Sequence, residues 1–444
     1  MDTKMNSQAG TFMYAADIEK MPRDQLRKLQ LERLKTQVGR TYYNTEYYRK
    51  RMDQAGVKPD DIKTLDDIRK LPMTSKEDLR ENFPFGMFAV PRTDVVRLHV
   101  SSGTTGTPTV VGYTMADLNV WTELVARSIA CVGVRPGDVF HNATALGMFT
   151  GGMGFHYGAE RLGCTVVPMS AGNTTKQLAL MRDFGAEVLC CTPSYALRLT
   201  EVAEETGINI QDKLRVGLFG AEAWSNEMRS NLEQRLGITT GDFWGLSEMT
   251  GPGVSVDCNE KNGLHVWEDC FLIEVLDPVT LEPVGPGETG EIVISTLVKQ
   301  AQPILRFRCR DLTRLIEEPC PCGRTHVRIE RVFGRSDDML TIRGVNLFPS
   351  QIESVLVNTK GIEHHYELVV EQSGAMAELT VNVEAAKTTD IAQYAQLSAT
   401  VGQIIKSTIG VTSIVKVLAP GSLPRWEEGK AVRVRDLRKS LKVS

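Results

Sequence analysis

A run of small hydroxyl residues and glycines between two apolar segments is the feature that most limits how this chain can fold. The run is Ser101-Ser102-Gly103-Thr104-Thr105-Gly106-Thr107-Pro108-Thr109, and residues 95–100 and 110–113 beside it have the apolar character of short strands. Glycines let a backbone curl so that its N–H groups converge, and hydroxyls add further donors. The sequence therefore predicts a strand–loop–strand unit that binds a polyanion such as a nucleotide phosphate chain. A plain surface loop is the alternative.

The loop lacks the Gly-Lys-[ST] ending of a Walker motif, and a strand rather than a helix is expected after it. Its ordered pattern resembles the phosphate loop of the acyl-adenylate-forming superfamily, in particular phenylacetate–CoA ligases. The resemblance runs from about residue 21 to about residue 437. Thr107 stands where that family usually has Lys, so one phosphate contact is expected to be missing while the backbone cradle is kept.

Composition limits the class of protein. Of 444 residues, 42% are hydrophobic and 24% charged, as in ordinary globular proteins of two or three domains. A net charge of −4 does not favour nucleic acid or an anionic membrane as a partner. The start of the chain lacks signal-peptide character, no apolar run reaches the length of a membrane span, and the nine cysteines are irregularly spaced. We expect a cytoplasmic protein, and the resemblance implies a homodimer.

The alternation of segments predicts an α/β fold. Strand-like and helical stretches alternate over residues 115–240, which favours parallel sheets covered by helices, and shorter strands over residues 254–317 predict an antiparallel β subdomain. A further α+β pattern follows residue 337. With the resemblance, we expect an N-terminal AMP-binding domain, residues 1–336, and a small mobile C-terminal lid, residues 337–444. A zinc subdomain is expected within residues 254–330.

Two segments are expected to surround the nucleotide base and the metal ion. Gly220-Ala221-Glu222-Ala223 ends a strand-like run, where open α/β sheets bind ligands, and the resemblance places it along the adenine. Phe243-Trp244-Gly245-Leu246-Ser247-Glu248 resembles the aromatic-Gly-x-[ST]-Glu motif. There the aromatic flanks the adenine, the hydroxyl faces the phosphates, and Glu248 holds Mg²⁺, a hard cation that prefers carboxylate oxygen. Trp244 replaces the usual Tyr.

Later motifs supply the ribose contact, the hinge and the catalytic cation. Asp311, after three arginines, resembles the carboxylate that accepts the ribose hydroxyls, although an internal ion-pair cluster is the alternative. Arg335 and Asp337 lie in Gly-Arg-Ser-Asp-Asp, which resembles the superfamily hinge. Arg335 would contact the adenylate and Asp337 would be the pivot. Lys430, in a Gly-Lys pair, resembles the lid lysine that bridges the acid carboxylate and the α-phosphate.

Cys258, His265, Cys320 and Cys322 are candidate structural zinc ligands. Cys₃His is a common zinc set, and the cysteines lie in short segments, the second of which reads Pro-Cys-Pro-Cys-Gly-Arg-Thr-His. His326 at the end of that segment is an alternative nitrogen ligand. Unpaired cytosolic thiols are the other explanation, because Cys-x-Cys is a weaker signal than Cys-x₂-Cys.

The resemblance implies an ATP-dependent acid–CoA ligase that forms an acyl-adenylate and then a thioester. Phe149, Phe155 and Leu146 are expected to line the acid pocket, which suits an aryl or arylalkanoic acid. ATP, Mg²⁺ and coenzyme A are the expected ligands. Two alternatives stay open: adenylyl transfer without thioester formation, as in coenzyme F390 synthetases, and a non-catalytic nucleotide- or acid-binding module.

Overall fold

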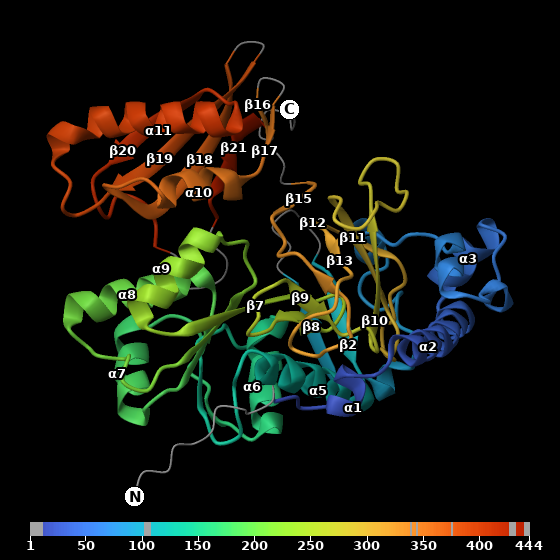
Figure 1. Cartoon of the computed structure of the whole chain (residues 1–444). Coiled ribbons are helices and arrows are strands. Elements are labelled where there is room, and N and C mark those ends of the chain that lie inside the picture. Colours follow the sequence, from blue (N-terminus) through green and yellow to red (C-terminus); the bar gives the residue numbers. More distant parts are fainter. Residues whose placement is uncertain are drawn as a thin grey trace, which may run out of the picture.

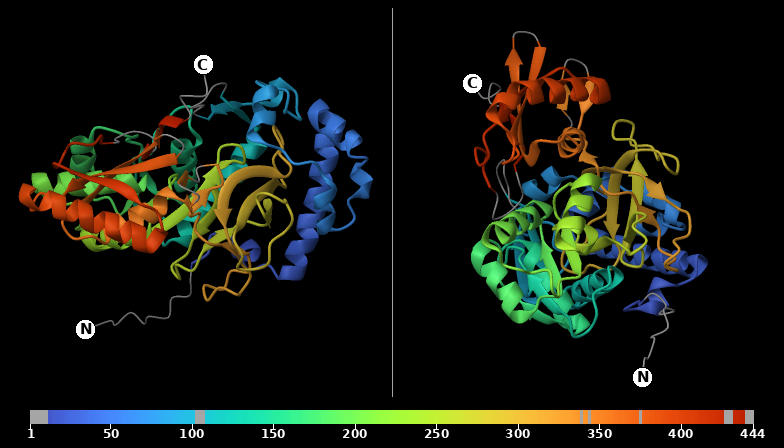
Figure 2. Two further views of the ribbon diagram at one scale, coloured as in Figure 1. Left: turned by 90° about the horizontal axis from the view of Figure 1, so that it is seen from above. Right: turned by 60° about the vertical axis from the view of Figure 1, so that its left-hand side comes forward.

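The computed structural model describes residues 12–101, 108–337, 340–342, 345–373, 376–425 and 432–438. The architecture is α/β, as expected from the sequence. A large N-terminal part holds two sheets and a hairpin, and a smaller C-terminal part lies against it (Figure 1). Figure 2 shows the same arrangement from two further sides. Among the described residues, no helix is both long and apolar enough to cross a membrane.

The largest sheet has nine strands in the order β13-β14-β9-β8-β7-β6-β5-β3-β4. Strands β4, β3, β5, β6 and β7 run parallel to one another, and β8 onward is antiparallel. The bounds are β3 (Val139–Asn142), β4 (Thr165–Val167), β5 (Val188–Cys191), β6 (Val216–Gly220), β7 (Thr239–Leu246), β8 (Gly251–Asp257), β9 (Leu264–Val266), β13 (Leu315–Ile316) and β14 (Arg328–Ile329). The parallel strands confirm the expectation from the alternating pattern.

Helices cover both faces of the parallel strands, which is why those strands are almost continuously apolar. In β5, Val188 and Cys190 belong to one core, while Leu189 and Cys191 belong to another. Helices α5 (Met115–Cys131) and α6 (Thr150–Leu162) contribute to the first core. Helices α7 (Thr174–Phe184), α8 (Pro193–Thr206) and α9 (Asn226–Leu236) contribute to the second.

An antiparallel sheet with the order β10-β11-β12-β15 lies beside the large one (Figure 1). Its strands are β10 (Phe271–Leu276), β11 (Gly290–Thr296), β12 (Phe307–Thr313) and β15 (Gly334–Arg335), and a separate hairpin joins β1 (Arg97–Val100) to β2 (Val110–Tyr113). The N-terminal helices are α1 (Ala16–Glu19), α2 (Arg23–Asn44), α3 (Glu46–Gln54) and α4 (Lys76–Glu81), with 3₁₀ turns at Pro59–Asp61, Leu65–Lys70 and Arg92–Asp94. The antiparallel subdomain expected after residue 254 is therefore present.

The C-terminal part has a core of its own. Its sheet has the order β20-β19-β18-β21, in which the central pair is antiparallel and each outer strand runs parallel to its neighbour. The elements are β16 (Leu340–Ile342), β17 (Val345–Leu347), α10 (Pro349–Val357), β18 (Ile362–Ser373), β19 (Met376–Ala385), a 3₁₀ turn Ile391–Gln393, α11 (Tyr394–Ile409), β20 (Ser413–Leu418) and β21 (Val434–Asp436). This is the α+β composition expected from the sequence.

Candidate active site

The hairpin β1–β2 holds the two ends of the phosphate-loop candidate together. Ser101 N–H donates to the carbonyl of Thr109 at 2.9 Å, and the two side-chain hydroxyls are hydrogen-bonded to each other. Ser102, Gly103, Thr104, Thr105, Gly106 and Thr107 lie outside the described residues. The buried Thr109 hydroxyl donates to Glu248 Oε1 at 3.4 Å. The base of the loop is therefore next to the candidate metal-holding carboxylate.

Glu248 follows β7 and is only 5% exposed. Its Oε1 atom is 3.7 Å from the Nζ atom of Lys76, and its backbone carbonyl accepts a hydrogen bond from Lys299 Nζ at 3.2 Å. The neighbouring Ser247 hydroxyl is 3.0 Å from the hydroxyl of Thr150. A carboxylate held between cations and hydroxyls at the carboxyl end of a parallel strand suits a ligand that carries charge.

Lys299 is a buried cation that sequence reasoning missed. Burial lowers its pKa to about 8, although Asp117 and Glu248 act in the opposite direction. Its ammonium also lies 4.9 Å from the centre of the Tyr113 ring. A single lysine outside any recognised motif is expected at the protein surface, so nothing in the sequence indicates that Lys299 is buried.

The Gly220–Ala223 segment leaves β6 through a tight backbone turn. A Cβ atom on Gly220 would lie 2.5 Å from the carbonyl oxygen of Phe243, so only glycine fits there. Ala221 has a φ of 69°, a left-handed conformation that is uncommon for a residue with a Cβ and is typical of functional turns. Glu222 accepts a hydrogen bond from the N–H of Ser194 at 2.7 Å. This connects the segment to the first turn of α8.

The aromatic motif contributes two buried rings with different partners. Phe243 packs edge-on against Phe155, with 4.6 Å between the ring centres. Trp244 instead points its indole N–H at Asp311 Oδ2, at 2.8 Å. Gly245 is required by packing, because its Cβ would lie 2.1 Å from the carbonyl oxygen of Gly251.

Asp311 joins three motifs that are far apart in the sequence. Trp244 donates to one carboxylate oxygen, and Arg335 donates to the other at 3.0 Å. Arg335 also donates twice to Asp337, at 2.9 and 3.0 Å. The structure therefore brings the candidate ribose, adenine and hinge residues into one hydrogen-bonded group. The arginines in and just before β12 pair elsewhere: Arg306 with Glu274, and Arg308 and Arg310 with Glu291.

The three residues predicted for the acid pocket differ in exposure. Phe155 is 1% exposed and packs on Phe243, whereas Phe149, at the N-cap of α6, is 46% exposed. Leu146 is partly buried, and its backbone N–H donates to the Ser170 hydroxyl at 3.1 Å. Their common role in a pocket stays a prediction. Lys430 lies outside the described residues, as do residues 338 and 339 after the hinge.

The four predicted zinc ligands lie together. The ligand atoms of Cys258, His265, Cys320 and Cys322 are all within 4.8 Å of one another, and all four residues are buried. The Sγ atoms of Cys258 and Cys320 are 3.7 Å apart, and Cys322 Sγ is 3.3 Å from His265 Nε2. Two sulfurs bound to one tetrahedral zinc would be about 3.8 Å apart. The hydrogen bond between Cys258 and Cys322 lowers the pKa of Cys322 and raises that of Cys258, and His265 lowers the pKa of Cys322 further.

His326, the alternative nitrogen ligand, has other partners. Its Nδ1 accepts from the N–H of Glu268 at 3.0 Å, so its Nε2 carries the proton that faces the Ile18 carbonyl at 3.1 Å. His265 has the opposite arrangement: its Nδ1 faces the His326 carbonyl at 3.3 Å, which leaves Nε2 for a metal. The geometry therefore favours His265.

Residues 319–326, which we call the cysteine knuckle, also contact α1 and the residues just after it. Arg324 Nε is 2.7 Å from Glu19 Oε2, and both side chains are completely buried. Thr325 donates to the carbonyl of Met21 at 2.6 Å. Helix α1 is thus packed on the segment that carries two of the candidate metal ligands.

Comparison with known proteins gives the family. Residues 23–297 match the family model for an AMP-binding enzyme, and residues 344–438 match that for the AMP-binding enzyme C-terminal domain. The phenylacetate-coenzyme A ligase of Thermus thermophilus is 47% identical over 96% of this chain and 100% of its own length. Those of Aromatoleum evansii and Escherichia coli are 49% and 48% identical, over 95% of this chain and 96% and 97% of theirs. The chain belongs to the phenylacetate–CoA ligase family.

The placement of the two parts in this member of the phenylacetate–CoA ligase family can be compared with solved structures. A 2-hydroxyisobutyryl-CoA ligase in the postadenylation state, with a bound acyl-AMP, matches with a TM-score of 0.90 at 29% identity, over 96% of this chain and 94% of that one. The same ligase with CoA in the thioesterification state covers the same shares but has a TM-score of only 0.71. Equal coverage with lower similarity indicates a different placement of the parts. The two parts of the present structure are therefore placed more nearly as in that ligase's postadenylation-state structure than as in its thioesterification-state structure.

Proposed function

We propose that this protein is an ATP-dependent acid–CoA ligase that acts on phenylacetate or a similar aryl or arylalkanoic acid. The observation that carries the proposal is the Asp311 group, in which Trp244 and Arg335 from two other motifs hold one carboxylate at both oxygens. A fixed carboxylate beside the carboxyl ends of β6 and β7 suits the vicinal hydroxyls of a ribose. Membership of the phenylacetate–CoA ligase family supports the reaction class.

In the first half-reaction, a carboxylate oxygen of the acid attacks the α-phosphorus of ATP, and pyrophosphate leaves. In the second, the CoA thiol attacks the acyl carbonyl, and AMP leaves as the thioester forms. The reacting atoms need alignment and charge neutralisation more than covalent help from the protein. We assign the phosphate contacts to the loop 101–109, the adenine to Gly220–Ala223, and a cation between the carboxylate and the α-phosphate to Lys430.

Glu248 fits Mg²⁺, because a buried carboxylate next to the Thr109 hydroxyl offers the hard oxygen ligands that this ion prefers. When bound, the ion would neutralise phosphate charge during adenylation. Glu248 would hold the ion, Thr109 would orient the Glu248 carboxylate, and Lys299 would hold the backbone carbonyl of Glu248 through a hydrogen bond.

Zinc is the proposed occupant of the cysteine cluster, with Cys258, His265, Cys320 and Cys322 as ligands. Four buried residues with ligand atoms within 4.8 Å of one another, and a Cys258–Cys320 sulfur separation of 3.7 Å, support this assignment over unpaired thiols. Zinc would then hold the knuckle on which α1 packs, a structural role. Elemental analysis of protein purified without chelator should find one zinc per chain, and a value far below one would refute it.

A pyrophosphate-release assay tests the function. With ATP, Mg²⁺ and phenylacetate we expect pyrophosphate, and with CoA also present we expect AMP and phenylacetyl-CoA. A panel of aryl and alkyl acids then defines the substrate. AMP transfer that ignores CoA would favour the adenylyltransferase alternative, and nucleotide binding without pyrophosphate release from any acid would favour the binding module.

Two further expectations remain predictions. A cytoplasmic location is supported by nine cysteines without a disulfide, which suits a reducing compartment. A homodimer follows from the sequence resemblance alone, and light scattering of the purified protein would test it.

A further inference from the structure

One buried glutamate of the C-terminal part connects it to the N-terminal part. Glu353 on α10 has a side chain only 4% exposed. Its Oε2 atom pairs with the guanidinium of Arg433 and accepts a hydrogen bond from the Tyr366 hydroxyl at 2.9 Å. Its Oε1 atom accepts from the backbone N–H of Ser225, at 3.3 Å. Glu353 therefore uses one oxygen within its own part and the other across the boundary.

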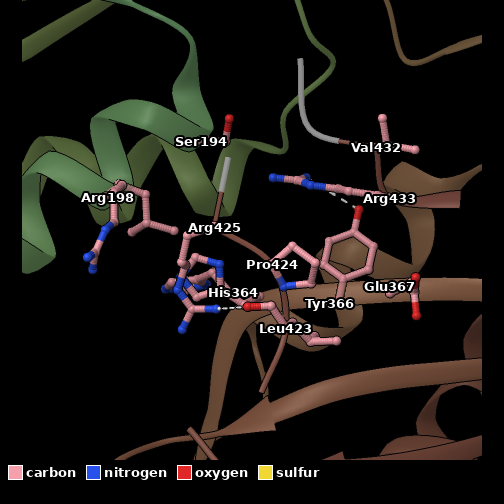
Figure 3. Close-up of a pocket in the computed structure, with 12 residues that line it drawn as sticks. Ser194, Arg198, His364, Tyr366, Glu367, Leu423, Pro424, Arg425, Val432 and Arg433 are labelled. Atoms are coloured by element: carbon pink, nitrogen blue, oxygen red, sulfur yellow. Dashed lines mark hydrogen bonds between the residues drawn. The ribbon is translucent and has the colours of Figure 1, made fainter. Parts of the chain in front are cut away.

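Arg433 contacts its neighbours through both its side chain and its backbone. Its guanidinium lies over the Tyr366 ring, 4.9 Å from the centre, and Figure 3 shows both residues opposite Ser194 of α8. Its carbonyl accepts from the N–H of Leu368 at 2.7 Å, next to the parallel pairing of β21 with β18. Burial opposes the charged form, but Tyr366, Glu353 and Glu222 outweigh it and raise the pKa of Arg433. The charged guanidinium thus lies within electrostatic range of Glu222 in the candidate adenine segment.

Ser225 connects this group to the nucleotide side. It is the N-cap of α9, directly after Trp224 and the Gly220–Ala223 segment, and its hydroxyl accepts from the N–H of Met228 at 3.1 Å. Helices α9 and α10 contact each other across the boundary (Figure 1). The bond from Ser225 N–H to Glu353 is therefore made beside the candidate adenine site.

The contact belongs to one arrangement of the two parts. The two parts lie as in the postadenylation-state structure of the 2-hydroxyisobutyryl-CoA ligase, and the Ser225–Glu353 hydrogen bond crosses the boundary in this arrangement. The pairing of Glu353 with Tyr366 and Arg433 lies within the C-terminal part and would move with it. Arg433 is three positions after Lys430 in the sequence, so a group that holds Arg433 holds one end of the segment that carries the candidate catalytic lysine.

We propose that Glu353 is a positioning residue for adenylate formation, which holds the C-terminal part against the N-cap of α9 through the N–H of Ser225 and sets the place of Arg433. The inference rests on the proposed ligase function. It assigns Glu353 no contact with substrate and no part in thioester formation.

A pair of variants isolates the bond across the boundary. Ser225 has a φ of −80°, which a proline ring accepts, so Ser225→Pro removes the N–H donor together with the cap hydroxyl. Ser225→Ala removes the hydroxyl alone and is the matched control, with a comparable loss of helix capping. Both changes leave the C-terminal part intact.

Each variant is measured in both half-reactions, with phenylacetate and ATP for pyrophosphate release and with supplied phenylacetyl-adenylate and CoA for thioester formation. We expect Ser225→Pro to adenylate about tenfold more slowly than Ser225→Ala, the effect of losing one hydrogen bond to a charged acceptor. Thioester formation should stay within about twofold. Equal adenylation by the two variants, or equal loss in both half-reactions, would overturn the proposal.

Glu353→Gln provides a second test, because the amide keeps the shape but loses the charge that pairs with Arg433. We expect slower adenylation from the loss of that charge. In Glu353→Ala, which also removes the acceptor oxygen, adding Ser225→Pro should cause little further loss, since both changes remove the Ser225–Glu353 hydrogen bond. Losses that multiply would contradict the proposed link. A wild-type protein that releases no pyrophosphate with any acid would refute the proposed function, whereas an active wild type with insensitive variants would refute only the role of Glu353.

Discussion

Replacing Lys299 by Met should make the protein more stable than the wild type at neutral pH. This difference in stability should shrink as the pH rises. The wild-type ammonium is buried beneath Glu248, and burial lowers its pKa from 10.5 to about 8. At about 1.4 kcal/mol for each tenfold change in proton affinity, keeping Lys299 charged in the fold costs on the order of 3 kcal/mol. Methionine has a similar length and carries no charge, so it avoids this cost.

The sign follows from proton binding. Between pH 8 and 10.5 the unfolded chain holds a proton that the folded Lys299 has released, so wild-type stability rises with pH across this window and falls as the pH is lowered through it. From pH 7 to pH 10 the wild type should gain roughly 2–3 kcal/mol relative to Lys299→Met. For a cooperative unit of roughly 320 residues this is about 4 °C in Tm.

Calorimetry of both proteins at the two pH values measures the difference. The Tm advantage of Lys299→Met should shrink as the pH rises. Lys299→Arg is the control, because arginine stays charged at both pH values and should show no such recovery. An advantage that is constant, or that grows with pH, would refute the assignment of a destabilised buried ammonium.

The remaining predictions concern the site. Trp244→Phe removes the indole N–H that donates to Asp311 and should raise the KM for ATP about tenfold. In an Asp311→Asn background the same change should raise the KM much less, and equal effects in both backgrounds would argue against the contact. Lys430→Ala should abolish most adenylation yet still convert supplied acyl-adenylate to thioester, and Asp337→Pro should do the reverse; parallel losses in either variant would exclude this division. Cys258→Ser should lower both the zinc content and the Tm, and an unchanged Tm would exclude a structural metal.

Much of the fold could be predicted because it depends on local patterns. The apolar strands β5 and β6 are buried on both faces, so their residues are continuously hydrophobic, and the alternation with helices then indicates parallel pairing. The cysteine cluster could be predicted because three of its four residues are cysteines that lie in two short segments of the sequence. The sequence could not decide between His265 and His326 as the nitrogen ligand. That choice depends on which ring nitrogen of each histidine is hydrogen-bonded to the backbone, and only the structure shows this.

Other parts of the site depend on contacts between distant segments. Trp244 and Asp311 are 67 positions apart, and the sequence does not indicate that the indole N–H of Trp244 donates to the Asp311 carboxylate. Glu353 and Lys299 look like ordinary charged residues, and only the packing around them makes one a bridge and the other a buried cation. A resemblance to a family carries over residues that belong to motifs, and neither of these does.

The buried pair between Glu19 and Arg324 has a consequence for how the protein is made. The two residues are 305 positions apart, so α1 leaves the ribosome long before its binding site on the cysteine knuckle exists. At about 5–20 residues per second, the delay is roughly 15–60 s, during which a buried glutamate of the finished protein is exposed in the nascent chain. Helix α1 therefore cannot pack on this site until residue 324 has been made, and chaperones have access to it throughout that interval.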